Sequence, residues 1–152
     1  AYLVSDMMRD VIRRGSGRRA NSLGRRDLSG KTGTTNDRND AWFNGFNADL
    51  VVATWVGFDQ AKDLGAREEG ARTALPMWIA FMKEALAGVP NHLTPKPPGL
   101  VTVRISPDTG LLARAGEGGA IFETFRVGHV PEGSEEEPGD PFTPEEEEET
   151  LF

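Results

Sequence analysis

The sequence contains no cysteine, which excludes a disulfide-stapled fold, a cysteine-based metal site and a cysteine nucleophile. Long apolar runs are also missing, since no stretch approaches the roughly 18–20 residues that a membrane-spanning helix needs. No charged segment followed by an apolar run opens the chain, so no signal peptide is visible. The 152 residues, of which 38% are hydrophobic, suffice for one modest domain or for part of a larger one.

Basic residues are absent from the end of the chain. Residues 131–152 contain ten acidic residues and no basic one, whereas residues 1–130 contain 17 basic and 14 acidic residues. Between Arg9 and Arg38, nine basic residues accompany three acidic ones. These early arginines could attract anionic polymers such as glycan strands or lipid headgroups, or they could form a solvated face. No nucleic-acid-binding motif accompanies them, so we expect no nucleic-acid partner.

Apolar periodicity predicts a helix at two places. Residues 1–14 carry apolar side chains at spacings of three and four. Because Ala1 already lies inside this pattern, we expect the chain to begin partway through a larger protein. The second helix is predicted to start at Pro76 and to end near Leu86, with Trp78 on its buried face.

Three strands are predicted between the helices, over residues 27–34, 41–46 and 50–58. Only a short loop of hairpin length separates the second from the third, so we expect antiparallel neighbours. The third run is apolar on both faces, which predicts a central strand that is covered on both sides. The aromatic side chains of these strands are expected to pack in the sheet core rather than to line a substrate groove. They are Trp42, Phe43, Phe46, Trp55 and Phe58.

This order of elements predicts an α+β fold, in which helices flank an antiparallel sheet. Residues 1–90 form this part and are too few to cover both faces of a three-stranded sheet, so we expect further strands and helices to come from elsewhere. Residues 91–130 form an extension, with short elements predicted at 100–105 and 121–127. Residues 131–152 are acidic and proline-rich, and we expect them to be unfolded.

The most informative stretch is 29–35, which reads Ser-Gly-Lys-Thr-Gly-Thr-Thr. On a strand, Lys31 and Gly33 share one face, and Thr32 and Thr34 share the other. Gly33 leaves room for a ligand or another chain to approach the backbone. A lysine with flanking hydroxyls can bind a carboxylate, and an exposed strand edge can pair with an extended peptide. On its own, Lys-Thr-Gly favours the simpler interpretation, which is an ordinary strand start with a solvated lysine.

Longer blocks surround this stretch. They are Leu-Ser-Gly-Lys-Thr-Gly-Thr-Thr-Asn-Asp at 28–37, Asp-Ala-Trp-Phe-Asn-Gly-Phe at 40–46 and Trp-Val-Gly-Phe-Asp at 55–59. Together they resemble penicillin-binding proteins, most closely the transpeptidase domain of the class A, bifunctional peptidoglycan synthases. The resemblance extends in order over about residues 1–130. It implies the C-terminal portion of a penicillin-binding/serine β-lactamase-like domain, which is an α+β fold.

The catalytic set of that family comprises a Ser-x-x-Lys motif, a Ser-x-Asn motif and Lys-Thr/Ser-Gly. None of the six serines here is followed by lysine three residues later or by asparagine two residues later. The resemblance therefore implies that the nucleophile, its activating lysine and the Ser-x-Asn pair lie on an upstream segment of the same protein. This segment would be one partner of the chain, which alone is expected to be inactive. Peptidoglycan stem peptides and β-lactam antibiotics would be the others.

The resemblance also implies roles for the residues of the motif. Lys31 would be a cation at the end of the cleft that holds the substrate carboxylate, and it would favour the deprotonated form of neighbouring catalytic groups. Thr32 and Thr34 would offer hydroxyls to that carboxylate, with Thr35 beside them. The backbone N–H of Thr34 would form half of an oxyanion hole. Gly33 would let a stem peptide or a β-lactam lie along the strand.

The implied reaction is D,D-transpeptidation through a serine ester, with a donor ending in D-Ala-D-Ala and an amine of a neighbouring stem peptide as acceptor. It requires no metal or organic cofactor. The implied location is the periplasmic face of the inner membrane, held by an upstream anchor. Three alternatives stay open: a D,D-carboxypeptidase, a serine β-lactamase-like hydrolase, and a catalytically inactive module that binds peptidoglycan or β-lactams.

Overall fold

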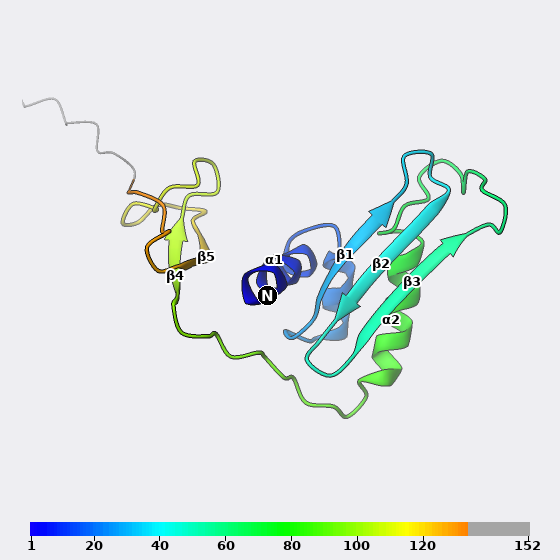
Figure 1. Cartoon of the computed structure of the whole chain (residues 1–152), viewed down its shortest axis with the longest axis horizontal. Coiled ribbons are helices and arrows are strands. Elements are labelled where there is room, and N and C mark those ends of the chain that lie inside the picture. Colours follow the sequence, from blue (N-terminus) through cyan, green and yellow to red (C-terminus); the bar gives the residue numbers. More distant parts are fainter. Residues whose placement is uncertain (134–152) are drawn as a thin grey trace, which may run out of the picture. The chain divides into compact units, whose positions relative to one another are not determined.

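The computed structural model describes residues 1–133 and divides into two units, Ala1–Pro98 and a second unit from Gly99 onward. The first unit contains α1 (Tyr2–Arg13), the 3-10 helix η1 (Arg18–Leu23), β1 (Ser29–Thr34), β2 (Asp40–Phe46), β3 (Val51–Gly57) and α2 (Ala74–Ala85). The second contains β4 (Leu100–Ile105) and β5 (Ile121–Arg126) (Figure 1). From residue 134 on, the acidic segment predicted to be unfolded lies outside the described residues.

The predicted order of helix, three strands and helix is confirmed, as is the antiparallel pairing of the strands. The 3-10 helix η1 was not predicted, because its polar sequence Arg-Arg-Ala-Asn-Ser-Leu has no apolar period. It ends at Gly24, whose φ of 66° is a left-handed conformation that glycine adopts at no steric cost. The first unit extends to Pro98, past the boundary predicted at residue 90.

The sheet has the order β1-β2-β3, so β2 is central and β3 lies at an edge. The prediction that residues 50–58 form a central strand covered on both sides is therefore wrong for the described unit. Val51 and Trp55 on β3 are 77% and 42% exposed. A run that is apolar on both faces does not reveal what covers the second face, and this unit supplies a covering layer for one face only.

The core lies between the sheet and α2, which crosses one face of it (Figure 1). Phe43 and Trp78 are fully buried there, with ring centroids 5.0 Å apart and planes at 63°. Gly45 makes this contact possible, because a Cβ on it would lie 2.6 Å from the Trp78 ring. Trp42 and Trp55 instead alternate onto the opposite face, where their ring centroids lie 6.2 Å apart and both side chains are exposed. The prediction that all five aromatic side chains are core is therefore only partly right.

Helix α1 buries a different stripe from the one that its apolar period indicates. Ile12 and Arg9 are its buried residues, while Val4 and Met7 are 59% and 63% exposed. The guanidinium of Arg9 pairs with Asp6 at 2.8 Å, one turn away. As in the sheet, apolar side chains of this unit remain without a covering layer.

The second unit is an antiparallel hairpin with long irregular connections. Its register pairs Leu100 with Arg126 and Ile105 with Ile121. The strand predicted at 100–105 is confirmed. The short element predicted at 121–127 is the strand β5, which ends one residue earlier. In residues 1–133, no helix has the length and apolar character required to cross a membrane.

Candidate functional site

The outer edge of β1 carries the Lys-Thr-Gly residues. β1 is a terminal strand, so β2 pairs with only one of its two edges. Helix α1 packs beside β1 on the other side (Figure 1). At the start of the strand, the Ser29 hydroxyl donates to the Ser5 carbonyl of α1 at 3.0 Å. Farther along, the covering ends, and the side chains of Lys31 and Thr34 are exposed.

The ammonium group of Lys31 folds back over this edge. Its Nζ donates to the Thr32 carbonyl at 3.0 Å and to Thr32 Oγ1 at 3.3 Å. Thr32 Oγ1 also lies 2.9 Å from the hydroxyl of Ser16, in the loop after α1. One cation and two hydroxyls therefore meet at the edge of β1, an arrangement suited to a carboxylate.

The backbone of β1 presents alternate N–H groups to the same edge. The N–H of Thr35 donates to the Asp40 carbonyl on β2 at 3.1 Å. Because successive residues of a strand direct their backbone groups to opposite sides, the N–H of Thr34 points away from β2. The bond from Lys31 to the Thr32 carbonyl fits the same alternation. The outer edge thus offers a backbone N–H at Thr34 that an extended ligand can reach.

The hydroxyl of Thr34 has a partner within the chain. It accepts the backbone N–H of Gly70 at 3.1 Å. A Cβ on Gly70 would lie 2.3 Å from the Trp42 carbonyl oxygen and 2.7 Å from that of Gly33, so only glycine allows this loop to pack so closely on the sheet. The role of the Thr34 hydroxyl toward a substrate carboxylate stays a prediction.

Thr35 and Gly33 have clear structural partners as well. Thr35 Oγ1 accepts the N–H groups of Asn39 and Asp40, both at 3.0 Å, and so fixes the turn between β1 and β2. Gly33 pairs with Trp42 across the sheet, and a Cβ on it would lie 3.2 Å from the Trp42 Cβ. A larger residue would therefore press against that indole, while glycine leaves the backbone accessible. Their places in a substrate-binding set stay predictions.

A buried ion pair fixes the entry to β1. Arg25 Nη2 lies 2.6 Å from the Asp27 carboxylate, with side-chain exposures of 10% and 0%. Asp27 also accepts the side-chain amide of Asn47 and the backbone N–H of His92. Burial raises the pKa of Asp27, but these hydrogen bonds and the charge of Arg25 lower it by more, so the pKa lies below its ordinary value.

Known proteins with similar sequence and structure identify the family. A scan against protein-family models found no match. The chain is 50% identical over 153 residues to penicillin-binding protein 1A of Pseudomonas aeruginosa, covering 96% of the chain and 18% of that protein. It is 42% identical over 131 residues to penicillin-binding protein 1A of Vibrio cholerae, covering 77% and 16%. The crystal structure of penicillin-binding protein 1A from Haemophilus influenzae matches it with a TM-score of 0.78 at 38% identity, covering 86% of this chain and 20% of that one.

The chain belongs to the class A penicillin-binding protein family. Its fold is the corresponding portion of the α+β penicillin-binding domain, as the sequence predicted. The chain spans less than a fifth of the length of the curated penicillin-binding proteins just described.

Ser16 is the site residue that the sequence analysis missed. No motif marks it in the sequence, yet its hydroxyl lies 2.9 Å from that of Thr32 at the edge of β1. The flanking Gly15 and Gly17 were the available signal. A Cβ on Gly15 would lie 2.9 Å from the Val11 Cα, so glycine is required for the loop to fold back on α1.

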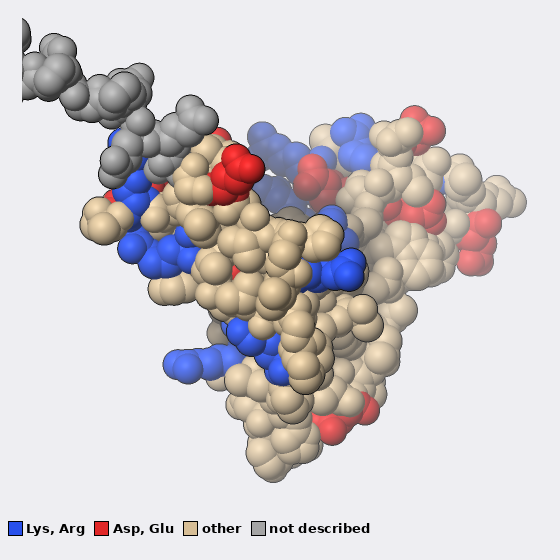
Figure 2. All heavy atoms as spheres, turned by 60° about the vertical axis from the view of Figure 1, so that its left-hand side comes forward, with Lys and Arg blue, Asp and Glu red and all other residues tan. Residues whose placement is uncertain are grey.

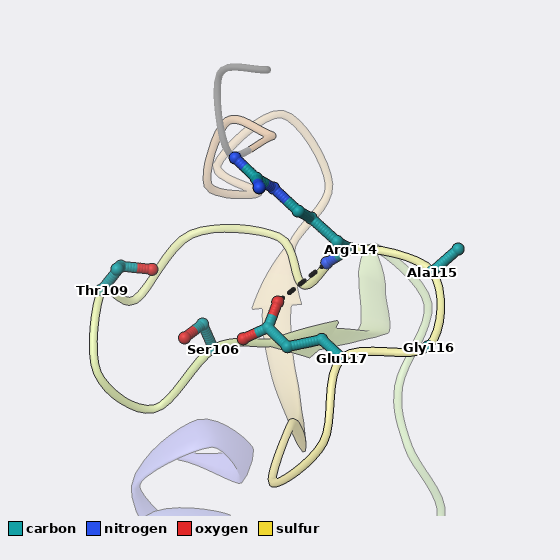
Figure 3. Close-up of a pocket in the computed structure, with 6 residues that line it drawn as sticks. All are labelled: Ser106, Thr109, Arg114, Ala115, Gly116 and Glu117. Atoms are coloured by element: carbon teal, nitrogen blue, oxygen red, sulfur yellow. Dashed lines mark hydrogen bonds between the residues drawn. The ribbon is translucent and has the colours of Figure 1, made fainter. Parts of the chain in front are cut away.

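A separate hollow of about 520 Å³ lies in the second unit, around Ser106, Thr109, Arg114 and Glu117. Figure 3 shows the Glu117 carboxylate turned toward the Arg114 backbone N–H, which donates to it at 2.9 Å. This bond, the hydroxyl of Ser106 and the charges of Arg104 and Arg114 lower the pKa of Glu117. The Glu117 carboxylate thus binds groups of the same loops, which is the arrangement of a structural turn. Across residues 1–133, no group of three or more His, Asp and Glu side chains is arranged to hold a metal ion.

Proposed function

We propose that this chain supplies the Lys-Thr-Gly strand of a serine D,D-transpeptidase that cross-links peptidoglycan stem peptides and is inhibited by β-lactams. The carrying observation is the outer edge of β1, where Lys31, Thr32 and the outward N–H of Thr34 lie together. The family supports the reaction class. We call the longer protein to which the chain would belong the parent protein.

In the proposed reaction, the hydroxyl oxygen of a serine on the upstream segment attacks the carbonyl carbon between the two D-Ala residues. The N–H of Thr34 donates to the oxygen that becomes negative, while Lys31 and Thr32 hold the terminal carboxylate. The C–N bond breaks, and the terminal D-Ala leaves with the proton taken from the serine. An acceptor amine then attacks the serine ester, the new amide forms, and the serine recovers a proton from that amine.

The uncovered surfaces of the first unit support an upstream partner segment. The sheet face that α2 does not cover exposes Trp42 and Trp55, and the outer edge of β3 is unpaired in the described structure. An apolar face beside a free strand edge favours further strands and helices of the same protein. We propose that this segment carries Ser-x-x-Lys, Ser-x-Asn and the membrane anchor, with the site on the periplasmic side.

The test is incubation of the parent protein with a D-Ala-D-Ala stem peptide, an acceptor amine and, separately, a fluorescent penicillin. We expect covalent labelling by the penicillin, and a cross-linked product formed with release of one D-Ala. Release of D-Ala without a cross-link would indicate a D,D-carboxypeptidase, and rapid turnover of the penicillin would indicate a β-lactamase. Non-covalent binding without labelling or product would indicate an inactive binding module and contradict the proposal.

A further inference from the structure

A second feature lies next to the outer edge of β1: a hollow of about 760 Å³ that we call the arginine hollow. Its lining residues are Arg14, Gly15, Ser16, Arg18, Arg19, Ala71 and Arg72. Four of these seven residues are arginines, and none is acidic. On the face of the molecule shown in Figure 2, Lys and Arg side chains likewise gather in groups.

The backbone on both sides of the hollow is closely held. On one side, the N–H groups of Gly15 and Gly17 both donate to the Val11 carbonyl, at 3.1 and 2.9 Å. On the other side, Gly70 packs on the sheet, and the N–H of Arg72 donates to the Glu69 carbonyl at 2.9 Å. Arginines more than fifty residues apart in the sequence are therefore brought together by fixed loops.

Within residues 1–133, only one of the four arginines that line the hollow has a carboxylate partner. Arg14 pairs with Asp10 one turn back on α1. Among residues 1–133, by contrast, no ion pair is formed by the guanidinium groups of Arg18, Arg19 or Arg72. Like charges in one hollow repel each other unless an anion binds, and the planar guanidinium matches a carboxylate with two parallel hydrogen bonds.

The position of the hollow indicates which anion it receives. Ser16 lines it and also binds Thr32, the neighbour of Lys31, at 2.9 Å. A peptide lying along the edge of β1 therefore passes directly beside these arginines. This placement favours a peptide carboxylate over a membrane headgroup.

We propose that the arginine hollow binds a carboxylate of the peptide substrate other than the terminal carboxylate assigned to Lys31. The inference rests on the proposed function and extends it, because it makes the enzyme selective for stem peptides with free acidic groups upstream of D-Ala-D-Ala. Arg18 and Arg72, which approach the hollow from separate segments, determine this selectivity.

The test compares two stem peptides that end in D-Ala-D-Ala, one with its internal carboxylates free and one with them amidated. With the wild-type parent protein, we expect kcat/KM to be roughly tenfold higher for the free acid, the scale of a charge-assisted hydrogen bond. The double variant R18Q/R72Q should reduce this ratio to about one. The control Arg26→Gln removes the same charge from an exposed arginine that does not line the hollow, and it should keep the ratio.

Equal kcat/KM for the two peptides in the wild type would overturn the inference without requiring any variant to fold. A ratio that persists in R18Q/R72Q would also overturn it. A third outcome would assign the hollow to a lipid phosphate instead. In it, phosphatidylglycerol micelles, but not phosphatidylcholine micelles, raise kcat/KM for both peptides, and the double variant loses this effect. Penicillin labelling of the wild type separates the two hypotheses, since its absence contradicts the proposed function itself.

Discussion

At the scale of single residues, the site depends on the groups that the ammonium of Lys31 can contact. Its Nζ lies within hydrogen-bond distance of the Thr32 carbonyl and hydroxyl, on an exposed strand edge. An ammonium group in that position can turn to an incoming carboxylate without rearrangement of the strand. The fold of β1 depends little on it, because the backbone pairing with β2 holds the strand.

We therefore expect Lys31→Ala in the parent protein to slow acylation by fluorescent penicillin on the order of 10²-fold, the scale of losing one electrostatic group from an active site. The thermal unfolding midpoint should not change. Lys83→Ala, at an exposed lysine in the last turn of α2, is the matched control and should acylate normally. Unchanged acylation in the Lys31 variant would remove this residue from the site.

Gly70 is the residue whose space is most restricted near the site. A Cβ there would meet backbone oxygens at 2.3 and 2.7 Å, and backbone cannot move aside cheaply. Gly70→Ala should lower the free energy of unfolding by about 2–3 kcal/mol. It should also weaken penicillin acylation, because the clash pushes the loop off the sheet and moves the backbone N–H of residue 70 away from the Thr34 hydroxyl. Gly118→Ala, where a Cβ meets nothing within 4 Å, should be neutral in both thermal denaturation and acylation. Equal stability of the two variants would contradict this packing.

At the scale of elements, the entry to β1 is held by the buried pair of Arg25 and Asp27. Arg25 also donates to the Val89 carbonyl at 2.6 Å and to that of Pro90 at 2.9 Å, beyond the end of α2. Arg25 thus links the entry to β1 with the segment that follows α2. This link could not be predicted from the sequence, because only the fold brings residues 25 and 90 together.

Asp27→Asn should lower the free energy of unfolding by about 3 kcal/mol, because it leaves a buried guanidinium without its counter-charge. Thermal denaturation of the parent protein at pH 7 measures this. Asp59→Asn, at an exposed aspartate, is the control and should cost little. A loss at Asp27 no larger than the control loss would show that the pair contributes no stability.

The same carboxylate predicts a pH dependence. Its pKa is lowered in the folded protein, so the ionised form stabilises the fold above the ordinary value of about 3.9. This stabilisation should be lost as the pH falls from about 4 through the lowered pKa. Between pH 5 and pH 3, the thermal unfolding midpoint of the wild type should therefore fall more steeply than that of Asp27→Asn. Parallel curves would contradict a lowered pKa.

The periodicity of apolar residues was sufficient to predict most helices and strands, but not which elements pack against them. The spacing of apolar residues located α1 and α2 and indicated β2, β3 and β4, because that signal is local. It misjudged β3 as central, since a run that is apolar on both faces does not reveal what covers the second face. Among the site residues, the Lys-Thr-Gly motif was visible in the sequence. Ser16 and Arg72 were not, because tertiary folding alone brings them to β1.

At the scale of the whole molecule, the first unit has one covered sheet face and one exposed apolar face. Val51 is the most exposed of its large apolar side chains. We propose that the upstream segment packs on this face. Val51→Lys should therefore weaken the association of that segment with the chain, because it buries a charge without a partner. When the chain is mixed with that segment, penicillin labelling should fall at least about tenfold in this variant. Ala48→Lys, in the exposed turn between β2 and β3, should label normally.

The central claim is that β1 supplies the cation and the backbone N–H of a site whose nucleophile lies on other polypeptide. Mass spectrometry after incubation with fluorescent penicillin tests this most directly, for the chain alone and for the chain mixed with the upstream segment. We predict no adduct on the chain alone, and in the mixture an adduct on a serine of the upstream segment. A covalent adduct on any of the six serines of this chain would contradict the account.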